Sequence, residues 1–282
     1  MISRSTMADD QRISSHYSSG TLMERLRAAL AAEGIDPDRP TVEQLAPFDH
    51  FHGRGLEATQ QAANLVAATS ADHIIDVGSG IGGPARYFAT RFGCRVTGID
   101  LTAEFCDVAR ALTRAVGLAD RIAFEQGNAL TMPFADASFD GAYSMNVSMN
   151  IADKAGLYRE VRRVLRPGAW FVLVEIAQGP AGAPTYPTPW ARTAETSFLS
   201  TAGETHEGLA AAGFTIVQSR DSVADALAFT ARSRALIARG EKPPFHAVYL
   251  IHGDLAREMA ANGARDLAAG KIIPIEILCR AH

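Results

Sequence analysis

The chain alternates short apolar runs with longer segments in which apolar residues recur every three or four positions. Runs of the length and composition of buried strands lie at residues 73–77, 95–99, 122–124, 139–144 and 170–174. Helical spacing follows most of them, as at 84–92 and in the segments after Thr102 and Asp153. Regular alternation of this kind predicts a parallel sheet with helices on both faces and right-handed crossovers.

The ends of these elements carry their own signals. Pro84 falls in a first helical turn, where the missing N–H costs nothing, and Thr102 and Asp153 are residue types that cap helices. The segment Arg166-Pro167-Gly168 ends the helix that follows Asp153. Two more strands, at 214–217 and 272–278, bring the predicted sheet to seven.

Three regions differ in composition and in the pattern of their apolar residues, and these differences predict the domain organisation. Residues 1–56 are polar and mixed, with one helix predicted from Leu22 to Glu33, and we interpret them as an N-terminal helical lid. Residues 57–282 form the α/β domain. Within it, 178–212 begins with a stretch rich in proline and glycine, which is typical of a substrate loop or lid.

Composition narrows the class of protein. The 282 residues are 47% hydrophobic and 21% charged, which excludes a chain that is mainly disordered. The net charge is −4 and there is no basic block, so the sequence gives no support for nucleic-acid binding. No apolar segment is long enough to predict stable membrane insertion.

Cysteines and the N-terminus predict the compartment. Cys94, Cys106 and Cys279 are too widely spaced for a disulfide framework or a zinc cage, and they fit a reducing environment. The opening Met1-Ile2-Ser3-Arg4 has no apolar region of a secretory signal. We therefore expect a cytoplasmic protein.

The first chemical motif is Asp76-Val77-Gly78-Ser79-Gly80-Ile81-Gly82-Gly83, between a predicted strand and a predicted helix. Glycines there let a ligand approach free backbone N–H groups, although a tight turn alone would also use them. Asp100 ends the next strand, and an acid about 20 residues after such glycines accepts hydrogen bonds from ribose hydroxyls. The pair suits NAD and any other adenosine ligand equally.

Three further segments favour one cofactor over the other. They are Gly127-Asn128-Ala129-Leu130, the run Pro133-Phe134-Ala135-Asp136-Ala137-Ser138-Phe139-Asp140, and Leu165-Arg166-Pro167-Gly168. Together with the glycine motif and Asp100, in this order and spacing, they resemble class I S-adenosylmethionine-dependent methyltransferases, in particular those similar to ubiquinone/menaquinone and sarcosine/dimethylglycine methyltransferases. The resemblance implies a Rossmann-like fold with S-adenosyl-L-methionine as cofactor and S-adenosyl-L-homocysteine as product.

The resemblance also implies cofactor contacts. Asp76 and the loop of Gly78, Ser79, Gly80 and Gly82 would face the methionyl part, and Asp100 would hold the ribose. Leu101 would pack on the adenine, and Asn128 and Ala129 would meet its edge, with asparagine where the family more often has aspartate. Met145 and Asn146 would lie beside the sulfonium. Apart from the resemblance, Tyr17 in the N-terminal segment is a candidate to close over the cofactor, and an ordinary surface position is the alternative.

Candidate catalytic and substrate residues are fewer. The segment 48–55 is comparable to an Asp-x-Phe-His-x-Gly-Gly segment of similar bacterial methyltransferases, and His50 and His52 in it are the candidate bases. A structural role is open for both, whereas metal binding lacks a third ligand. Phe51, Asn150, Trp190 and Arg192 are the candidate substrate residues; an aromatic such as Trp190 can also bind an ammonium group or simply pack.

These features predict methyl transfer to a nitrogen, oxygen or carbon atom of a small-molecule acceptor by in-line displacement. The run 143–150 lacks the histidine that many relatives carry there. An NAD-dependent oxidoreductase and a non-catalytic binder of S-adenosyl ligands are the alternatives. The small molecule is the expected partner, without nucleic acid or metal, and a homodimer is compatible with the sequence.

Overall fold

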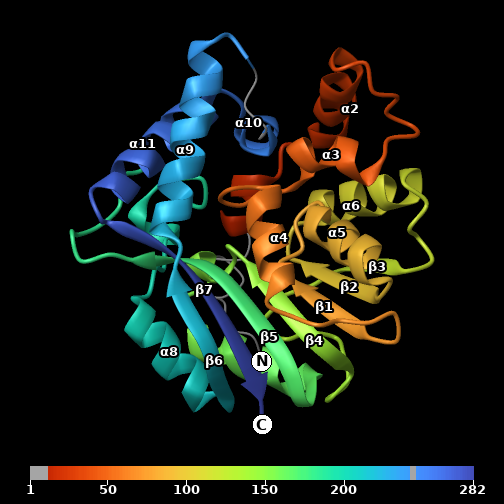
Figure 1. Ribbon diagram of the computed structural model, residues 1–282, viewed down its shortest axis with the longest axis vertical. Coiled ribbons are helices and arrows are strands. Elements are labelled where there is room, and N and C mark those ends of the chain that lie inside the picture. Colours follow the sequence, from red (N-terminus) through yellow and green to blue (C-terminus); the bar gives the residue numbers. More distant parts are fainter. Residues whose placement is uncertain (1–11, 242–245) are drawn as a thin grey trace.

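A computed structural model describes residues 12–241 and 246–282. The prediction made from Met1-Ile2-Ser3-Arg4 therefore lies outside the described residues. Its seven-stranded sheet has the order β3-β2-β1-β4-β5-β7-β6 (Figure 1). The strands are β1 (His73–Val77), β2 (Arg95–Asp100), β3 (Ile122–Gln126), β4 (Phe139–Met145), β5 (Leu165–Gln178), β6 (Phe214–Asp221) and β7 (Ile272–Ala281). Only β7 runs antiparallel to its neighbours, which confirms the predicted Rossmann-like, mostly parallel sheet.

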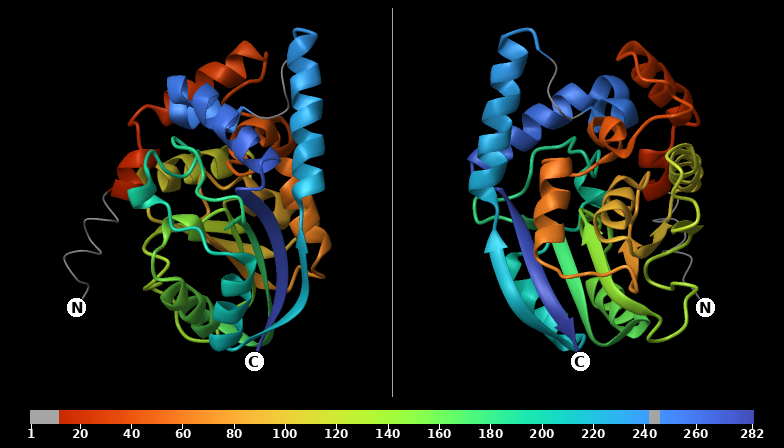
Figure 2. Two further views of the ribbon diagram at one scale, coloured as in Figure 1. Left: turned by 90° about the vertical axis from the view of Figure 1, so that its left-hand side faces the viewer. Right: turned by 45° about the vertical axis from the view of Figure 1, so that its right-hand side comes forward.

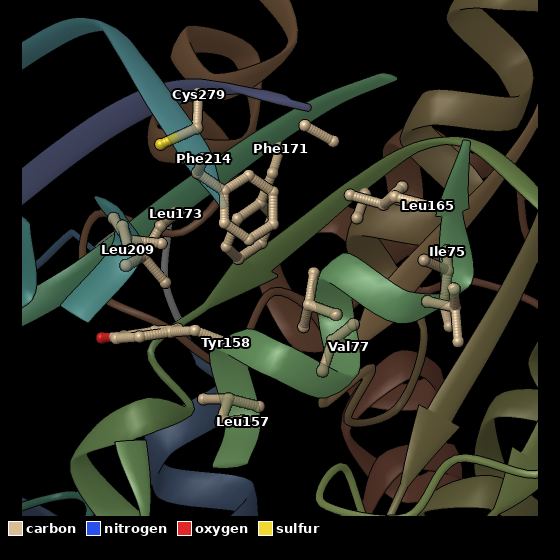
Figure 3. Close-up of a cluster of buried hydrophobic side chains, with 14 of the residues drawn as sticks. Ile75, Val77, Leu157, Tyr158, Leu165, Phe171, Leu173, Leu209, Phe214 and Cys279 are labelled. Carbon is tan, nitrogen blue, oxygen red and sulfur yellow. The ribbon is translucent and has the colours of Figure 1, made fainter. Parts of the chain in front are cut away.

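Helices cover both faces of this sheet. One face packs against α4 (Leu56–Asn64), α5 (Gly83–Phe92) and α6 (Ala103–Ala115), and the other against α7 (Lys154–Val164) and α8 (Ala202–Ala211). Figure 3 shows the second interface, where Leu157 and Tyr158 of α7 approach Phe171 of β5 and Phe214 of β6. The helical spacing in the sequence therefore records burial against the sheet.

Two of the predicted helix starts differ in detail. Asp153 caps α7, since its side chain accepts a hydrogen bond from the Gly156 N–H. Thr102 occupies the N-cap position of α6, but its side chain makes no capping hydrogen bond. Its backbone N–H instead donates to the Asp100 carboxylate at 2.9 Å, which holds this turn against β2.

A second group of helices stands above the carboxyl ends of the parallel strands (Figures 1 and 2). We call this group the cap; it consists of α2 (Leu22–Ala32), α3 (Val42–Asp49), α9 (Val223–Ala238), α10 (Ala247–His252) and α11 (Ala256–Ala268). Segments from both ends of the chain meet in it, because α10 packs against α2 and α3. The His246 N–H donates to the Pro47 carbonyl at 2.7 Å at this contact.

The cap is built differently from the lid that the sequence suggested. Helix α8 lies within the predicted loop 178–212, yet it packs on α7 and β6 as part of the sheet's cover. Residues 222–271, between β6 and β7, supply α9, α10 and α11 to the cap. The N-terminal segment is thus one half of the cap, and the connection between the last two strands is the other.

Candidate functional site

A first cavity of about 400 Å³ opens where β1, β2, β3 and β4 end. We call it the nucleotide cavity. The predicted cofactor residues that line it are Tyr17, Gly78, Gly80, Asp100, Leu101, Asn128, Ala129, Met145 and Asn146. They come together because the carboxyl ends of parallel strands share one edge of the sheet, where ligands bind in open α/β folds.

The glycine loop forms the floor of the nucleotide cavity. Gly78 has φ +79°, and a Cβ atom there would stand 2.2 Å from a methyl group of Val147, so only glycine fits. Gly80 has φ +53° and open space beside its Cα, so its backbone is accessible to a ligand. The Gly80 N–H donates to the Asp100 carboxylate at 2.8 Å, which ties the loop to β2.

Three predicted cofactor residues lie behind this lining rather than in it: Asp76, Ser79 and Gly82. A Cβ atom on Gly82 would stand 2.5 Å from the Phe124 ring, so this glycine serves the packing of α5. The Asp76 carboxyl is buried with one oxygen lacking a hydrogen-bond partner. Burial raises the pKa of Asp76 to about 8.

Another wall of the nucleotide cavity combines the Asp100 carboxylate with apolar side chains. Asp100 reaches the cavity from the end of β2, and burial raises the pKa of its carboxyl group. Ile99, Leu101 and Phe105 supply apolar surface beside it. The Asn128 side chain accepts a hydrogen bond from the Leu130 N–H at 2.8 Å, which fixes the turn after β3. A carboxylate next to a flat apolar slot matches a ribose joined to a purine.

A second cavity of about 460 Å³ lies under the cap, between the 189–190 segment and helices α9, α10 and α11. We call it the cap cavity. Its lining shares Tyr17, Phe51 and Asn146 with the nucleotide cavity. A molecule in each cavity would therefore meet at these three residues.

Tyr17 closes that junction from the N-terminal helical residues. Its hydroxyl donates to the Asn150 side-chain oxygen at 2.8 Å, and the Asn150 amide donates to the Trp190 carbonyl at 2.6 Å. Burial raises the pKa of Tyr17 well above its usual value, so the phenol is neutral and acts as a donor. The predicted residues Tyr17, Asn150 and Trp190 thus form one connected group.

The two candidate bases are differently placed. His52 lines the cap cavity, but its Nδ1 faces the Gly53 carbonyl at 3.3 Å and its Nε2 faces the Thr59 hydroxyl at 3.1 Å. Burial lowers the pKa of His52 to about 3. His50 lines neither cavity; its Nδ1 bonds the Asp49 carboxylate at 2.6 Å. The geometry gives neither ring a free nitrogen that lines a cavity.

Of two other predicted substrate residues, one lines a cavity and the other does not. Trp190 lines the cap cavity and donates from its ring N–H to the Ser197 hydroxyl at 2.9 Å. Arg192 lines neither cavity. Burial is the main cause of the lowered pKa values of His16 and His252, and the positive charge of Arg192 lowers both pKa values further. Residues of α9 and α11 that line the cap cavity were not predicted. The signal available for them was the length of 222–271. A short turn can join two antiparallel neighbouring strands such as β6 and β7, so a connection this long indicates an additional structural unit.

Two searches concern the described part of the chain only. No group of three or more His, Cys, Asp or Glu side chains is placed there to hold a metal ion. No helix in that part is long and apolar enough to cross a membrane.

Known proteins are similar to this chain in sequence and in fold. Residues 75–173 match a family described as "Methyltransferase domain". Methyltransferase phqN of Penicillium fellutanum is 35% identical over 141 residues, which are 50% of this chain and 40% of that protein. The chain spans less than half the length of the curated relatives it matches.

Among solved structures, geranyl diphosphate C-methyltransferase from Streptomyces coelicolor A3(2), in complex with S-adenosyl-L-homocysteine, has a TM-score of 0.66 at 19% identity. The match covers 81% of this chain and 78% of that one. The [4+2]-cyclase SpnF has a TM-score of 0.65 at 22% identity, covering 86% of this chain and 97% of that one. At these identities the structures show a shared fold.

Proposed function

Since residues 75–173 form a class I S-adenosylmethionine-dependent methyltransferase domain, we propose that the chain transfers the methyl group of S-adenosyl-L-methionine to a small molecule held in the cap cavity. One observation carries this proposal: two cavities of different character lie side by side and share Tyr17, Phe51 and Asn146 in their linings. Such a junction is what a transfer between two bound molecules requires.

The residues of the nucleotide cavity fit the cofactor. Asp100 would accept hydrogen bonds from the ribose hydroxyls, with the adenine between Leu101 and the Asn128-Ala129 turn. The exposed backbone at Gly80 suits the methionyl end, and Asp76 supports the loop from behind. When bound, this cofactor supplies an activated methyl group on a sulfonium.

The protein's own task is alignment and exclusion of water. Tyr17 and Asn150 close the junction from above, and Met145 and Asn146 support it from the end of β4. The half-buried rings of Tyr17 and Phe51, which lie 6.0 Å apart, cover the junction and would limit the access of solvent. Because His50 and His52 offer no free nitrogen to the cavities, we propose that His52 shapes the cavity wall and that the acceptor needs no histidine base.

Calorimetric binding tests the cofactor. We expect S-adenosyl-L-methionine and S-adenosyl-L-homocysteine to bind, and NAD and NADP not to bind. Asp100→Ala should weaken binding at least about tenfold, because it removes a charged hydrogen-bond acceptor. Asp107→Ala, an exposed carboxylate on α6, is the matched control and should leave binding unchanged.

Binding of NAD without S-adenosyl ligands would contradict the proposal and favour hydride transfer. A second candidate is a non-methylating use of the same fold, favoured by the likeness to the [4+2]-cyclase SpnF. Formation of S-adenosyl-L-homocysteine during incubation with acceptors separates the two, since a cyclase or a mere binder would leave the cofactor intact.

A further inference from the structure

The lining of the cap cavity is mostly carbon and carries an uneven charge. Met149, Trp190, Val248 and Met259 are among its apolar residues. Its charged residues are two arginines, Arg54 and Arg234, and no aspartate or glutamate of the described chain lines it. The cavity therefore has no carboxylate that would attract a cationic acceptor.

The charge of Arg54 is already compensated within the protein. Its side chain is 5% exposed and forms a close ion pair with Glu276, which is 2% exposed. It also donates to the Gln61 side chain and lies 3.7 Å from the Asp225 carboxylate. Arg54 thus belongs to a structural network that joins the cap to β7.

Arg234 differs from Arg54 in having no partner among the described residues. It lies on α9 at the exposed rim of the cavity, and no described residue forms a hydrogen bond or ion pair with it. The other arginines of the helix and its end are paired, Arg232 with Glu57 and Arg239 with Glu241. A guanidinium left unpaired beside an apolar cavity is suited to bind an anionic oxygen pair.

The neighbouring residue gives a second, independent observation. The Ser233 hydroxyl lines the same cavity, is buried, and has no hydrogen-bond partner. A buried hydroxyl without a partner costs free energy unless a ligand supplies one. Ser233 and Arg234, consecutive residues of α9, are therefore two donors without a partner among the described residues in a lining that is mostly apolar.

We propose that Ser233 and Arg234 form an anion subsite, so that the acceptor is an amphiphile with an apolar body and a carboxylate or phosphate group. As a statement about the acceptor it rests on the proposed methyl transfer, with the cap cavity as the acceptor site. The apolar body fills the cavity between Trp190 and Met259, and the anionic group reaches Arg234 at the rim. Cationic acceptors are disfavoured, because the lining offers two arginines and no carboxylate.

Four probes that each carry a chain of ten carbons test the anion subsite: decanoate, decyl phosphate, decanol and decyltrimethylammonium. Binding is followed by the change in tryptophan fluorescence, to which Trp190 in the cavity lining contributes beside Trp170, in the 282-residue chain saturated with S-adenosyl-L-homocysteine. We expect the better of the two anions to bind at least about tenfold more tightly than decanol, and the cation most weakly. The order of decanoate and decyl phosphate tells which anionic group the subsite prefers.

Variants assign the effect to the subsite. Arg234→Gln should reduce the affinity for the preferred anion to that for decanol, Arg234→Lys should retain part of the difference, and Arg234→Glu should invert it toward decyltrimethylammonium. Arg257→Gln is the matched control, because Arg257 is exposed on α11 and does not line the cavity. Equal affinities of wild type for the anions and decanol, or an unchanged anion affinity in Arg234→Gln, would overturn the proposal.

The subsite and the proposed function can fail separately. Binding of S-adenosyl-L-homocysteine is measured on its own in the same preparations, and the probe titrations are repeated without it. Anion preference without any S-adenosyl binding would leave the subsite standing and remove the cofactor proposal. S-adenosyl binding without anion preference would do the reverse.

Discussion

At the scale of single residues, Asp76 links the glycine loop to the pH dependence of the protein. Its carboxyl group is 2% exposed, one oxygen lacks a partner, and burial raises its pKa to about 8. The folded chain therefore keeps a proton that the unfolded chain releases near pH 4. Folding takes up this proton between about pH 4 and pH 8, so the contribution of Asp76 to stability falls as pH rises through that range.

We expect Asp76→Asn to flatten the pH dependence of stability. In the wild type, one proton bound on folding gives a slope of up to about 1.4 kcal/mol per pH unit, with stability lower at higher pH. Urea unfolding at several pH values between about 5 and 8 measures it. Asp107→Asn, with a side chain that is 76% exposed, is the control and should keep the wild-type slope. A slope unaltered in Asp76→Asn would contradict the assignment.

At the scale of elements, a buried ion pair joins the cap to the α/β domain. Arg86 of α5 is fully buried and pairs with Asp49 at the end of α3 at 2.9 Å. Arg86 also donates to the Thr113 hydroxyl and the Ile81 carbonyl, while Asp49 bonds His50. Burial alone would raise the pKa of Asp49, but the charges of Arg86 and His50 outweigh it and hold that pKa below its usual value.

Removing one partner of this pair leaves an uncompensated buried charge. We expect Arg86→Met to lower the free energy of unfolding by about 3–5 kcal/mol. Arg91→Met tests the same helix at an exposed position, where the side chain bonds Asn64 and Tyr87, and should cost less than about 1 kcal/mol. Equal losses in chemical denaturation would show that the Asp49 contact contributes nothing specific.

At the scale of the whole molecule, the N-terminal segment is fastened to the domain beside the nucleotide cavity. The Glu104 carboxylate, in the first turn of α6, accepts hydrogen bonds from the backbone N–H groups of Ser19, Gly20 and Leu22. Partial burial raises the pKa of Glu104, but these donors together outweigh it and hold that pKa below its usual value. This one carboxylate thereby holds the turn that leads from Tyr17 into α2.

We expect Glu104→Ala to loosen this segment while leaving the sheet intact. Hydrogen exchange of the Ser19, Gly20 and Leu22 amides should accelerate, whereas amides of β4 and β5 should keep their protection. Binding of S-adenosyl-L-homocysteine should weaken, because Tyr17 would close the junction less often. Asp107→Ala, on the same helix, should change neither, and unchanged exchange in Glu104→Ala would refute the anchor.

The sequence by itself determined the α/β domain and the nucleotide cavity. Each of the first five strands contains a short apolar run. Asp100 ends one of these strands, and the glycine loop and the Asn128 turn follow two others. Strand ends in a parallel sheet meet at one edge, so local pattern was enough to bring these residues together.

Only the tertiary structure decided the cap and the cap cavity. Helices α9 to α11 connect β6 to β7, and α10 among them packs against α2 and α3. No periodicity in the sequence encodes that contact. Packing likewise left His50 outside both cavities, engaged both ring nitrogens of His52, and placed Ser233 and Arg234 in the lining of the cap cavity. Which side chain faces a cavity depends on segments far apart in the chain, so the lining of the cap cavity is fixed by packing rather than by local sequence.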